Sequence, residues 1–414
     1  MNQKIVDHLF RHQYGKMTAI LTKFFGLSHI ELIEDAVQDT FIKATLQWRT
    51  RLPENPEAWL FQATRNRIID LLRQGKAEKS RYGKFLTGPA TIQLNDLFLA
   101  HEVEDSQLRM IFVACHPFLS AEEQIAFALK TISGFSMKEI AAALLLKKET
   151  IKKRLSRSRK TIVEKNIQFD YPAPNEIHQR MAGVLQVIYL IFNEGFNSTK
   201  PDQLISKDLC GEALRLCKLL LKKKNFRSGS LYALFALMCF HSSRLESKIG
   251  PDNEIVDLEH QDRSRWYRPL IALGNDAMIK SLEYQDTSAY HLEAEIAFEH
   301  VNASRFKETN WKKILELYKQ LQSLQPSDSN LMSMAIIHLQ LNNLVESKKL
   351  LDSVNEKNLE HRSYLLFGCY ADYYLKKGDF EKSIKFIGKA ITLATNESEK
   401  NYIVMKRSLL LSRN

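Results

Sequence analysis

Hydrophobic residues recur at helical spacing along almost the whole chain, and no run alternates in the way that strand residues do. On the helix expected at Glu31–Trp48, the inward positions are Ile33, Val37, Phe41 and Ala44. Only fifteen glycines and ten prolines interrupt the pattern, mostly where a helix would end. The pattern therefore predicts an all-α protein.

Breaks in the pattern divide the chain into five parts. The expected parts are a helical unit at residues 1–75, a linker at 76–104, a second helical unit at 105–166, a helical extension at 176–300 and a repeat region at 305–414. Gly83, Gly88 and Pro89 mark the linker, and Pro172 and Pro174 mark a break before the extension. The length of 414 residues agrees with several domains.

The repeat in the last part has an offset of 36 residues. Residues 342–348 (Asn-Asn-Leu-Val-Glu-Ser-Lys) resemble residues 378–384 (Gly-Asp-Phe-Glu-Lys-Ser-Ile). Tetratricopeptide repeats have a similar period of about 34 residues. Ala371 and Ala390 provide small side chains where paired helices would pack closely. The pattern predicts stacked helix pairs that share one continuous core.

Composition changes this picture only a little. The net charge of +11 favours a polyanionic partner, although charge alone argues about association and not about fold. Five scattered cysteines without a Cys-x-x-Cys pair favour free thiols in a reducing cytoplasm. No signal peptide opens the chain, and its apolar stretches are far shorter than the roughly 20 residues of a membrane span. We therefore expect a cytoplasmic protein with no membrane partner.

The strongest local pattern lies at residues 120–162. Ser136 and Glu139 form a capping box in front of a short helix, which we expect at Met137–Leu144. After a break, a second helix is expected at Glu149–Ile162. A capped helix, a short break and a second helix together predict a helix–turn–helix unit.

The second of these helices carries a dense basic face. Eight of residues 147–160 are basic, and only Glu149 is acidic. An apolar stripe would hold such a helix to its neighbour while the basic face entered the major groove of DNA and neutralised phosphates. The expected DNA-contacting residues are Lys147, Lys148, Thr150, Lys152, Lys153, Arg154 and Arg157. A solvated basic helix is the simpler alternative, but the combination with the capped helix favours DNA binding.

The first unit presents two faces of different charge. The outer positions of its helix at Glu31–Trp48 are Asp35, Gln38, Asp39 and Ile42. The next helix begins at Asn55-Pro56, and its outer positions are Gln62, Arg65, Asn66 and Arg73. An acidic face followed by a basic, polar face suggests a module that bridges a basic protein and DNA. Simple solvation of both faces is the commoner fate of surface charge.

Three segments of the first unit resemble region 2 of sigma-70-family factors, particularly the small group IV (extracytoplasmic-function) class. They are residues 34–41 (Glu-Asp-Ala-Val-Gln-Asp-Thr-Phe), 55–60 (Asn-Pro-Glu-Ala-Trp-Leu) and 63–70 (Ala-Thr-Arg-Asn-Arg-Ile-Ile-Asp). Residues 108–162 resemble region 4 of the same class. One departure is Leu145, at a turn position that glycine often holds in such units.

The resemblance implies a sigma factor, which is not an enzyme and needs no cofactor. The segment that docks on the clamp helices of core RNA polymerase corresponds to Asp35, Gln38, Asp39 and Phe41. The segment that engages the −10 element of promoter DNA corresponds to Trp59, Arg65, Asn66 and Arg73. The basic helix at Lys148–Lys160 falls where the −35 element is read.

The rest of the chain resembles a subgroup with a large C-terminal extension that ends in tetratricopeptide-type repeats. The segments concerned are residues 189–196 (Tyr-Leu-Ile-Phe-Asn-Glu-Gly-Phe), 210–216 (Cys-Gly-Glu-Ala-Leu-Arg-Leu) and 261–266 (Gln-Asp-Arg-Ser-Arg-Trp). We expect the extension to regulate activity in cis or to bind a protein partner on its repeats.

Two other functions remain open. A helix–turn–helix regulator that acts without polymerase would have no need of the acidic helix at Asp35–Phe41. An enzyme within residues 176–300 would need a site, and His291 and Glu295 have metal-ligand spacing. A lone His-x-x-x-Glu is a frequent accident, so we expect no metal and no catalytic residue. Arg263, together with Arg265 and Trp266, is expected to form an inter-helix or interdomain latch.

Overall fold

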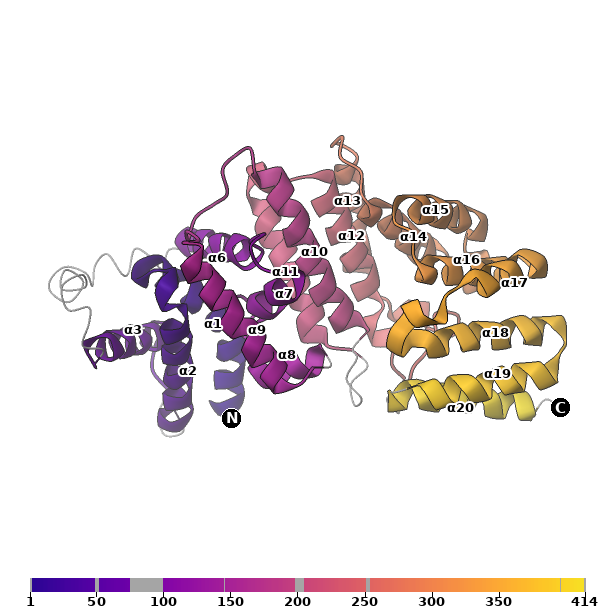
Figure 1. Ribbon diagram of the computed structural model, residues 1–414, viewed down its shortest axis with the longest axis horizontal. Coiled ribbons are helices and arrows are strands. Elements are labelled where there is room, and N and C mark those ends of the chain that lie inside the picture. The colour runs from indigo at the N-terminus through magenta and orange to yellow at the C-terminus, as the bar shows by residue number, and fades with distance from the viewer. Residues whose placement is uncertain are drawn as a thin grey trace. The chain divides into compact units, whose positions relative to one another are not determined.

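The computed structural model describes residues 2–48, 52–74, 100–144, 146–197, 205–250, 254–394 and 396–412. Within these ranges every regular element is a helix, apart from one isolated bridge between Ile249 and Ile255 (Figure 1). The prediction of an all-α protein is therefore confirmed. The chain forms two compact units, Met1–Ile191 and Phe192–Asn414.

The first unit begins with a three-helix module. Its elements are α1 (Asn2–Phe25), the short 3₁₀ helix η1 (Leu27–His29), α2 (Ile30–Gln47) and α3 (Pro56–Gln74). All four positions that we expected to face inward on α2 are buried in a core shared with α1 and α3. The N-cap expected at Asn55 is confirmed, because its Oδ1 accepts a hydrogen bond from the Ala58 amide at 3.1 Å.

The helix–turn–helix follows in the same unit. Its elements are α6 (Ala100–Ala114), α7 (Ala121–Thr131), α8 (Met137–Ala143) and α9 (Lys148–Glu164). The predicted capping box is present: the Ser136 amide donates to Glu139 at 2.8 Å, and the Glu139 amide donates to Ser136 Oγ at 3.2 Å. Gly134 has a φ of 71°, and an added Cβ would lie 2.9 Å from Tyr14 of α1. The turn before α8 therefore packs closely on the first module. Leu145 lies outside the described residues.

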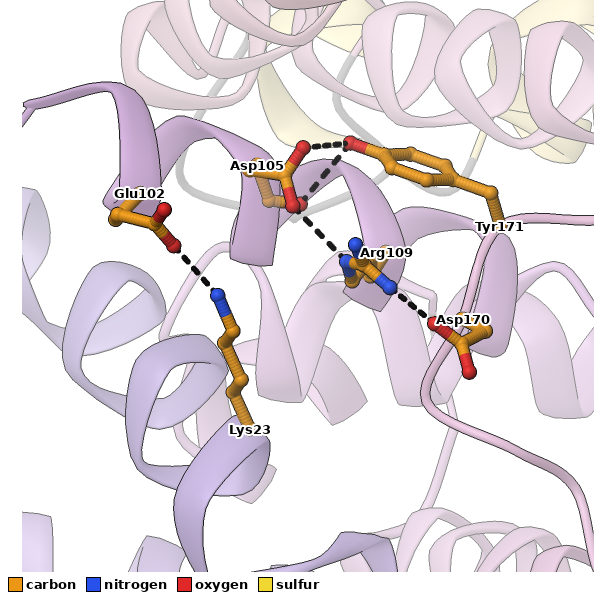
Figure 2. Close-up of polar contacts among 6 residues, drawn as sticks. All are labelled: Lys23, Glu102, Asp105, Arg109, Asp170 and Tyr171. Atoms are coloured by element: carbon orange, nitrogen blue, oxygen red, sulfur yellow. Dashed lines mark hydrogen bonds and ion pairs between the residues drawn. The ribbon is translucent and has the colours of Figure 1, made fainter. Parts of the chain in front are cut away.

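Two boundaries differ from those expected. Helix α6 begins at Ala100, so the last part of the expected linker is helical; residues 75–99 lie outside the described part. The segment at Pro172 and Pro174 lies within the first compact unit, which extends to Ile191. Figure 2 shows why: Tyr171 donates to Asp105 Oδ1 at 2.7 Å, and Asp170 pairs with Arg109, so hydrogen bonds hold this segment against α6.

Helix α10 (Ile177–Phe196) starts in the first unit and ends in the second. The second unit continues with α11 (Lys207–Lys222), η2 (Lys224–Phe226), α12 (Gly229–Ser243), η3 (Leu245–Ser247), η4 (Arg263–Arg265), α13 (Arg268–Ser281) and α14 (Ala289–Asn302). Helix α12 is buried along almost its whole circumference, and α11, α13 and α14 pack around it.

Helix pairs complete the second unit. They comprise η5 (Phe306–Glu308), α15 (Trp311–Leu324), α16 (Asp328–Gln340), α17 (Leu344–Ser353), η6 (Glu356–Arg362), α18 (Ser363–Lys377), α19 (Phe380–Leu393) and α20 (Glu397–Leu411). The offset of 36 residues relates two equivalent turns. Asn342 (φ 58°) and Gly378 (φ 83°) are left-handed, and each is followed by an N-cap, Asn343 or Asp379. Helices α16 and α18 thus turn into α17 and α19 in the same way.

Candidate functional site

The outer face of α2 combines carboxylates with exposed aliphatic side chains. Asp35 and Asp39 are exposed, as are Ile42 (61%) and Leu46 (59%) in the following turns. The pKa of Asp35 is raised, first by partial burial and then by its neighbour Glu31. Gln38 is half-buried beside this face.

Phe41 does not belong to this surface. It is only 4% exposed and packs in the core between α1, α2 and α3. Its side chain therefore supports the helix from behind and is not available for direct contact with a partner.

A hollow of about 400 Å³ lies between α2 and α3. Its lining residues are Asp39, Thr40, Lys43, Gln47, Trp59, Gln62, Ala63, Asn66, Arg67 and Asp70. Trp59 is half-buried and meets Trp48 edge to face, with ring centroids 5.3 Å apart. Arg67 and Asp39 form an ion pair of 2.9 Å across the two helices.

This hollow brings together residues to which we had assigned different roles. Asp39 was expected to contact polymerase, and Trp59 and Asn66 were expected to contact DNA, yet all three line one concavity. Arg65 is not among its lining residues; Arg73 lies in α3, but its side chain is outside the described part. Our sequence reasoning missed Arg67, although its charge opposite Asp39 was a usable signal.

Helix α9 turns a basic face to solvent. Its buried stripe comprises Ile151, Leu155, Ser158 and Ile162. The exposed cations on and beside it are Lys147, Lys148, Lys152, Lys153, Arg157 and Lys160. Thr150 is half-buried near the start of the helix.

Two arginines of α9 are used for internal pairing. Arg154 binds Glu122 of α7, and only 16% of its side chain is exposed. Arg159 donates to Glu31 at 2.8 Å and also binds Glu34, so it ties α9 to α2. Arg154 was expected to contact DNA, but in this structure its side chain is held by a carboxylate of the neighbouring helix.

Glu34 is the centre of a buried charge group, which we call the Glu34 cluster: Glu34, Arg159, Lys130 and Tyr14. Glu34 is 1% exposed, and burial raises its pKa while Arg159 and Lys130 oppose that rise. Lys130 of α7 is 4% exposed and lies over the Tyr14 ring at 5.1 Å. The Glu34 cluster links helices of both modules of the first unit.

The metal-ligand pattern in the extension has another explanation. His291 accepts a hydrogen bond from the Ser288 amide at 3.1 Å and so caps α14, while Glu295 pairs with Lys313 at 2.9 Å. In the part of the chain that the structure describes, no three His, Cys, Asp or Glu side chains gather as a metal site would require. Nor does any helix there have the length and apolarity needed to cross a membrane.

These features define an all-α protein whose first unit joins a three-helix module to a helix–turn–helix with a basic outer helix. Residues 9–78 match the model of sigma-70 region 2, and residues 109–162 match that of sigma-70 region 4. In these two regions the chain is similar to sigma-70-family sigma factors. Region 2 contains α2 and the hollow, and region 4 contains α9. Residues 180–282 match a family of unknown function, DUF6596.

Two relatives extend the comparison. The chain is 31% identical to the uncharacterized protein R00370 of Rhizobium meliloti over 394 residues, which are 94% of this chain and 92% of that protein. It is 27% identical to the ECF RNA polymerase sigma factor SigE of Mycolicibacterium smegmatis over 157 residues, which are 38% of this chain and 59% of SigE. The likeness to R00370 therefore includes the extension.

Proposed function

We propose that this protein is a sigma factor of the group IV class, which binds core RNA polymerase through α2 and directs it to promoter DNA through α3 and α9. The observation that carries the proposal is the pair of exposed faces on the two matched regions. One, on α2, is acidic and aliphatic, and the other, on α9, is basic. Opposite charges on two linked modules suit one protein partner and one nucleic-acid partner.

The docking face comprises Asp35, Asp39, Ile42 and Leu46. Two aliphatic side chains that are more than half exposed gain free energy when a partner covers them. The flanking carboxylates would pair with basic side chains on the polymerase and fix the orientation of the complex. Gln38 lies beside this face and adds a hydrogen-bonding group.

The −35 element would be bound by α9. Its exposed lysines and Arg157 would neutralise backbone phosphates, so binding should weaken steeply as salt increases. Thr150 lies near the N-terminal end of the helix, where recognition helices contact base edges. Arg154 would have to leave Glu122 before it could contact DNA.

The hollow between α2 and α3 would receive an unpaired base of the −10 element. Trp59 offers an aromatic face for stacking, and the amides of Gln62 and Asn66 offer donors and acceptors to base edges. Arg65 and Arg73 would contribute positive charge to the same DNA strand.

We further propose that the extension regulates the sigma modules in cis and that its helix pairs are tetratricopeptide-like. Equivalent turns 36 residues apart and stacked helix pairs support the repeat assignment. Such a stack offers a surface for a protein partner.

Co-purification of the full-length protein with core RNA polymerase tests the docking face. The double variant Asp35→Arg, Asp39→Arg should bind core enzyme at least about tenfold more weakly, because it opposes like charges across the interface. Asp276→Arg with Glu283→Arg is a matched control, since both residues are exposed in the second unit and the net charge changes equally. Retained binding in the first double variant would refute the docking face.

A helix–turn–helix regulator that acts without polymerase is the alternative function. The exposed aliphatic pair on α2 disfavours it, because such a regulator has no partner to cover Ile42 and Leu46. Transcription in vitro with core enzyme separates the two: a sigma factor confers promoter-specific initiation on core enzyme alone, whereas a regulator does not.

A further inference from the structure

Basic side chains gather in the interior of the second unit, where the sequence alone had suggested only a latch. We call this group the basic cluster: His241 and Arg244 at the end of α12, Lys248 after η3, Arg263 in η4 and His300 in the last turn of α14. Electrostatic interactions link them, since Arg244 acts on His241, Lys248 and His300.

The ring of Phe196, at the end of α10, lies among these groups. The Lys248 ammonium is 3.9 Å from the ring centroid, and the Arg244 guanidinium carbon is 4.9 Å from it. Both cations therefore approach the same apolar surface, and their charges are close to each other.

Several hydrogen-bond donors in the basic cluster are unused or poorly used. Arg244 has only long contacts, 3.5 Å to Gln261 Oε1 and 3.4 Å to His241 Nδ1. Arg263 donates through Nη1 to the carbonyl groups of His300 and Ala303, each at 2.6 Å, which confirms an inter-helix latch to the end of α14. Its Nη2 is buried without a partner, as is Nδ1 of His300.

Among the residues that the structure describes, few carboxylates act on the basic cluster. Glu399 acts on Lys248 and Glu308 acts on Arg263, but within the described residues neither forms an ion pair with them. Burial and the mutual repulsion of the cations lower the pKa of Lys248 to about 7, that of Arg244 to about 10 and that of His300 to about 4. The cluster is therefore an unfavourable concentration of positive charge.

The cluster nevertheless lies close to the protein surface. His241, Arg244 and Lys248 are half-buried, so each keeps some contact with water while the protein surrounds most of its side chain. A group of basic side chains near the surface, with no carboxylate paired to it among the described residues, favours an anion from solution.

We propose that the basic cluster binds a phosphate group, either as inorganic phosphate or as part of a small phosphorylated metabolite. The guanidinium of Arg244 and the free Nη2 of Arg263 offer N–H donors in the fork arrangement that suits phosphate oxygens, and Lys248 adds a point charge. This site lies wholly within the second unit and does not depend on the polymerase-binding and DNA-binding proposal. It would give the extension a small-molecule ligand.

A purely structural role makes a different prediction. Lys248 donates to the Phe196 carbonyl and to Asn197, and Arg263 caps α14, so both contribute to helix ends. Arg244 makes no comparable bond, and it is therefore the residue whose charge best separates ligand binding from support of the fold.

Titration calorimetry and thermal unfolding of the full-length protein test the site, with inorganic phosphate as the probe and sodium chloride at equal ionic strength as the reference. Arg244→Met keeps an alkyl chain against Phe196 but removes the charge. We expect saturable phosphate binding and a raised Tm in the wild-type protein, and at least about tenfold weaker binding in Arg244→Met. In phosphate-free buffer the Tm of Arg244→Met should be unchanged or higher.

Arg265→Gln is the matched control, because Arg265 belongs to the same segment but is exposed beside Asp262. It should bind phosphate like the wild-type protein. Equal responses of wild-type protein and Arg244→Met to phosphate would overturn the proposal, as would a lower Tm of Arg244→Met with undiminished binding. If Arg244→Met does not fold, Lys248→Met is measured in the same way.

Ribose 5-phosphate distinguishes the two sources of the phosphate group. Tighter binding of the ester than of inorganic phosphate would indicate a phosphorylated metabolite, and the reverse order would indicate the free ion. Binding of neither above the chloride reference would refute the site.

Discussion

The two units of the molecule treat buried charge in opposite ways. In the Glu34 cluster of the first unit, a carboxylate lies between Arg159 and Lys130, and the chain supplies its own counter-charge. In the basic cluster of the second unit, Arg244 and Lys248 face each other without a paired carboxylate among the described residues. A buried charge that is paired internally holds helices together, whereas one without a partner suggests that the counter-charge arrives with a ligand.

Removal of the central carboxylate should have the largest effect. Glu34→Ala leaves Lys130 buried without its carboxylate and leaves Arg159 only the exposed Glu31 as a partner, so we expect a loss of about 3–5 kcal/mol in the free energy of unfolding of the first unit. Denaturant unfolding followed by circular dichroism measures it. Glu31→Ala is the control: its side chain is 67% exposed, and the loss should be below about 1 kcal/mol. Equal losses of unfolding free energy in Glu34→Ala and Glu31→Ala would show that the buried pairing of Glu34 stabilises the fold no more than an exposed ion pair does.

Removal of one cation from each cluster should affect the free energy of unfolding differently: Lys130→Met should lower it, and Arg244→Met should not. Lys130→Met gives up the attraction to Glu34 and the contact with Tyr14, which should cost about 1–2 kcal/mol. Arg244→Met relieves repulsion and should leave the free energy of unfolding unchanged or higher in anion-free buffer. Thermal unfolding of both variants provides the comparison, and destabilisation of both to a similar extent would contradict the distinction.

The pH dependence of anion binding should follow Lys248. The pKa of Lys248 is about 7 in the folded protein, whereas its ordinary value is 10.5. Between pH 7 and pH 10.5, the amine is therefore protonated in the unfolded chain and largely deprotonated in the folded protein. The stability of the empty protein therefore rises as pH increases over this range. Sulfate is the suitable probe because its own charge does not change over this pH range. It binds best when Lys248 is protonated, so the affinity of the protein for sulfate should fall about tenfold from about pH 6.5 to about pH 8.5.

Calorimetric titration with sulfate at several pH values measures this dependence, and Lys248→Met should remove it. The groups that act on Lys248 are Arg244, Cys210, Glu399 and Arg362. Burial raises the pKa of Cys210 to about 12, so the thiol does not titrate in the range used. An unchanged pH profile in Lys248→Met would assign the titration to another group.

The smallest effect is expected at the exposed pair of Asp39 and Arg67. These side chains are 48% and 42% exposed, so solvent screens their attraction despite the distance of 2.9 Å. Arg67→Gln should change the free energy of unfolding by less than about 1 kcal/mol. Denaturant unfolding beside Glu34→Ala shows whether burial, and not pairing alone, sets the contribution; a loss as large as that of Glu34→Ala would refute this view.

Much of the local structure could be predicted from short-range patterns. The spacing of Ser136 and Glu139 predicted a capped helix because the two groups satisfy each other's amides, and the offset between Asn342 and Gly378 marked equivalent turns. The capping box depends on residues three positions apart, and each of the two turns depends on adjacent residues, so these signals can be recognised locally.

The roles of individual charges could not be predicted in this way. Arg159 and Glu34 are 125 residues apart, and counting the cations of α9 did not distinguish Arg159 from Lys152. A partial signal existed: Glu34 follows Ile30 by four positions on the buried side of α2. Pro172 and Pro174 marked an interruption between helices, but they did not show that the neighbouring Tyr171 binds Asp105, which lies 66 residues away in the sequence.

The course of α10 has a practical consequence for dissecting this protein. Its first half supplies Arg180, which binds the Phe112 carbonyl, and Val184, which is fully buried within the unit that contains both sigma regions. A fragment cut at the prolines would lack this covering and would expose apolar surface prone to aggregation. If such a fragment were inactive, the cause could be misfolding of the first unit as well as loss of the extension. A fragment meant to test the sigma regions alone should therefore include the chain up to Ile191.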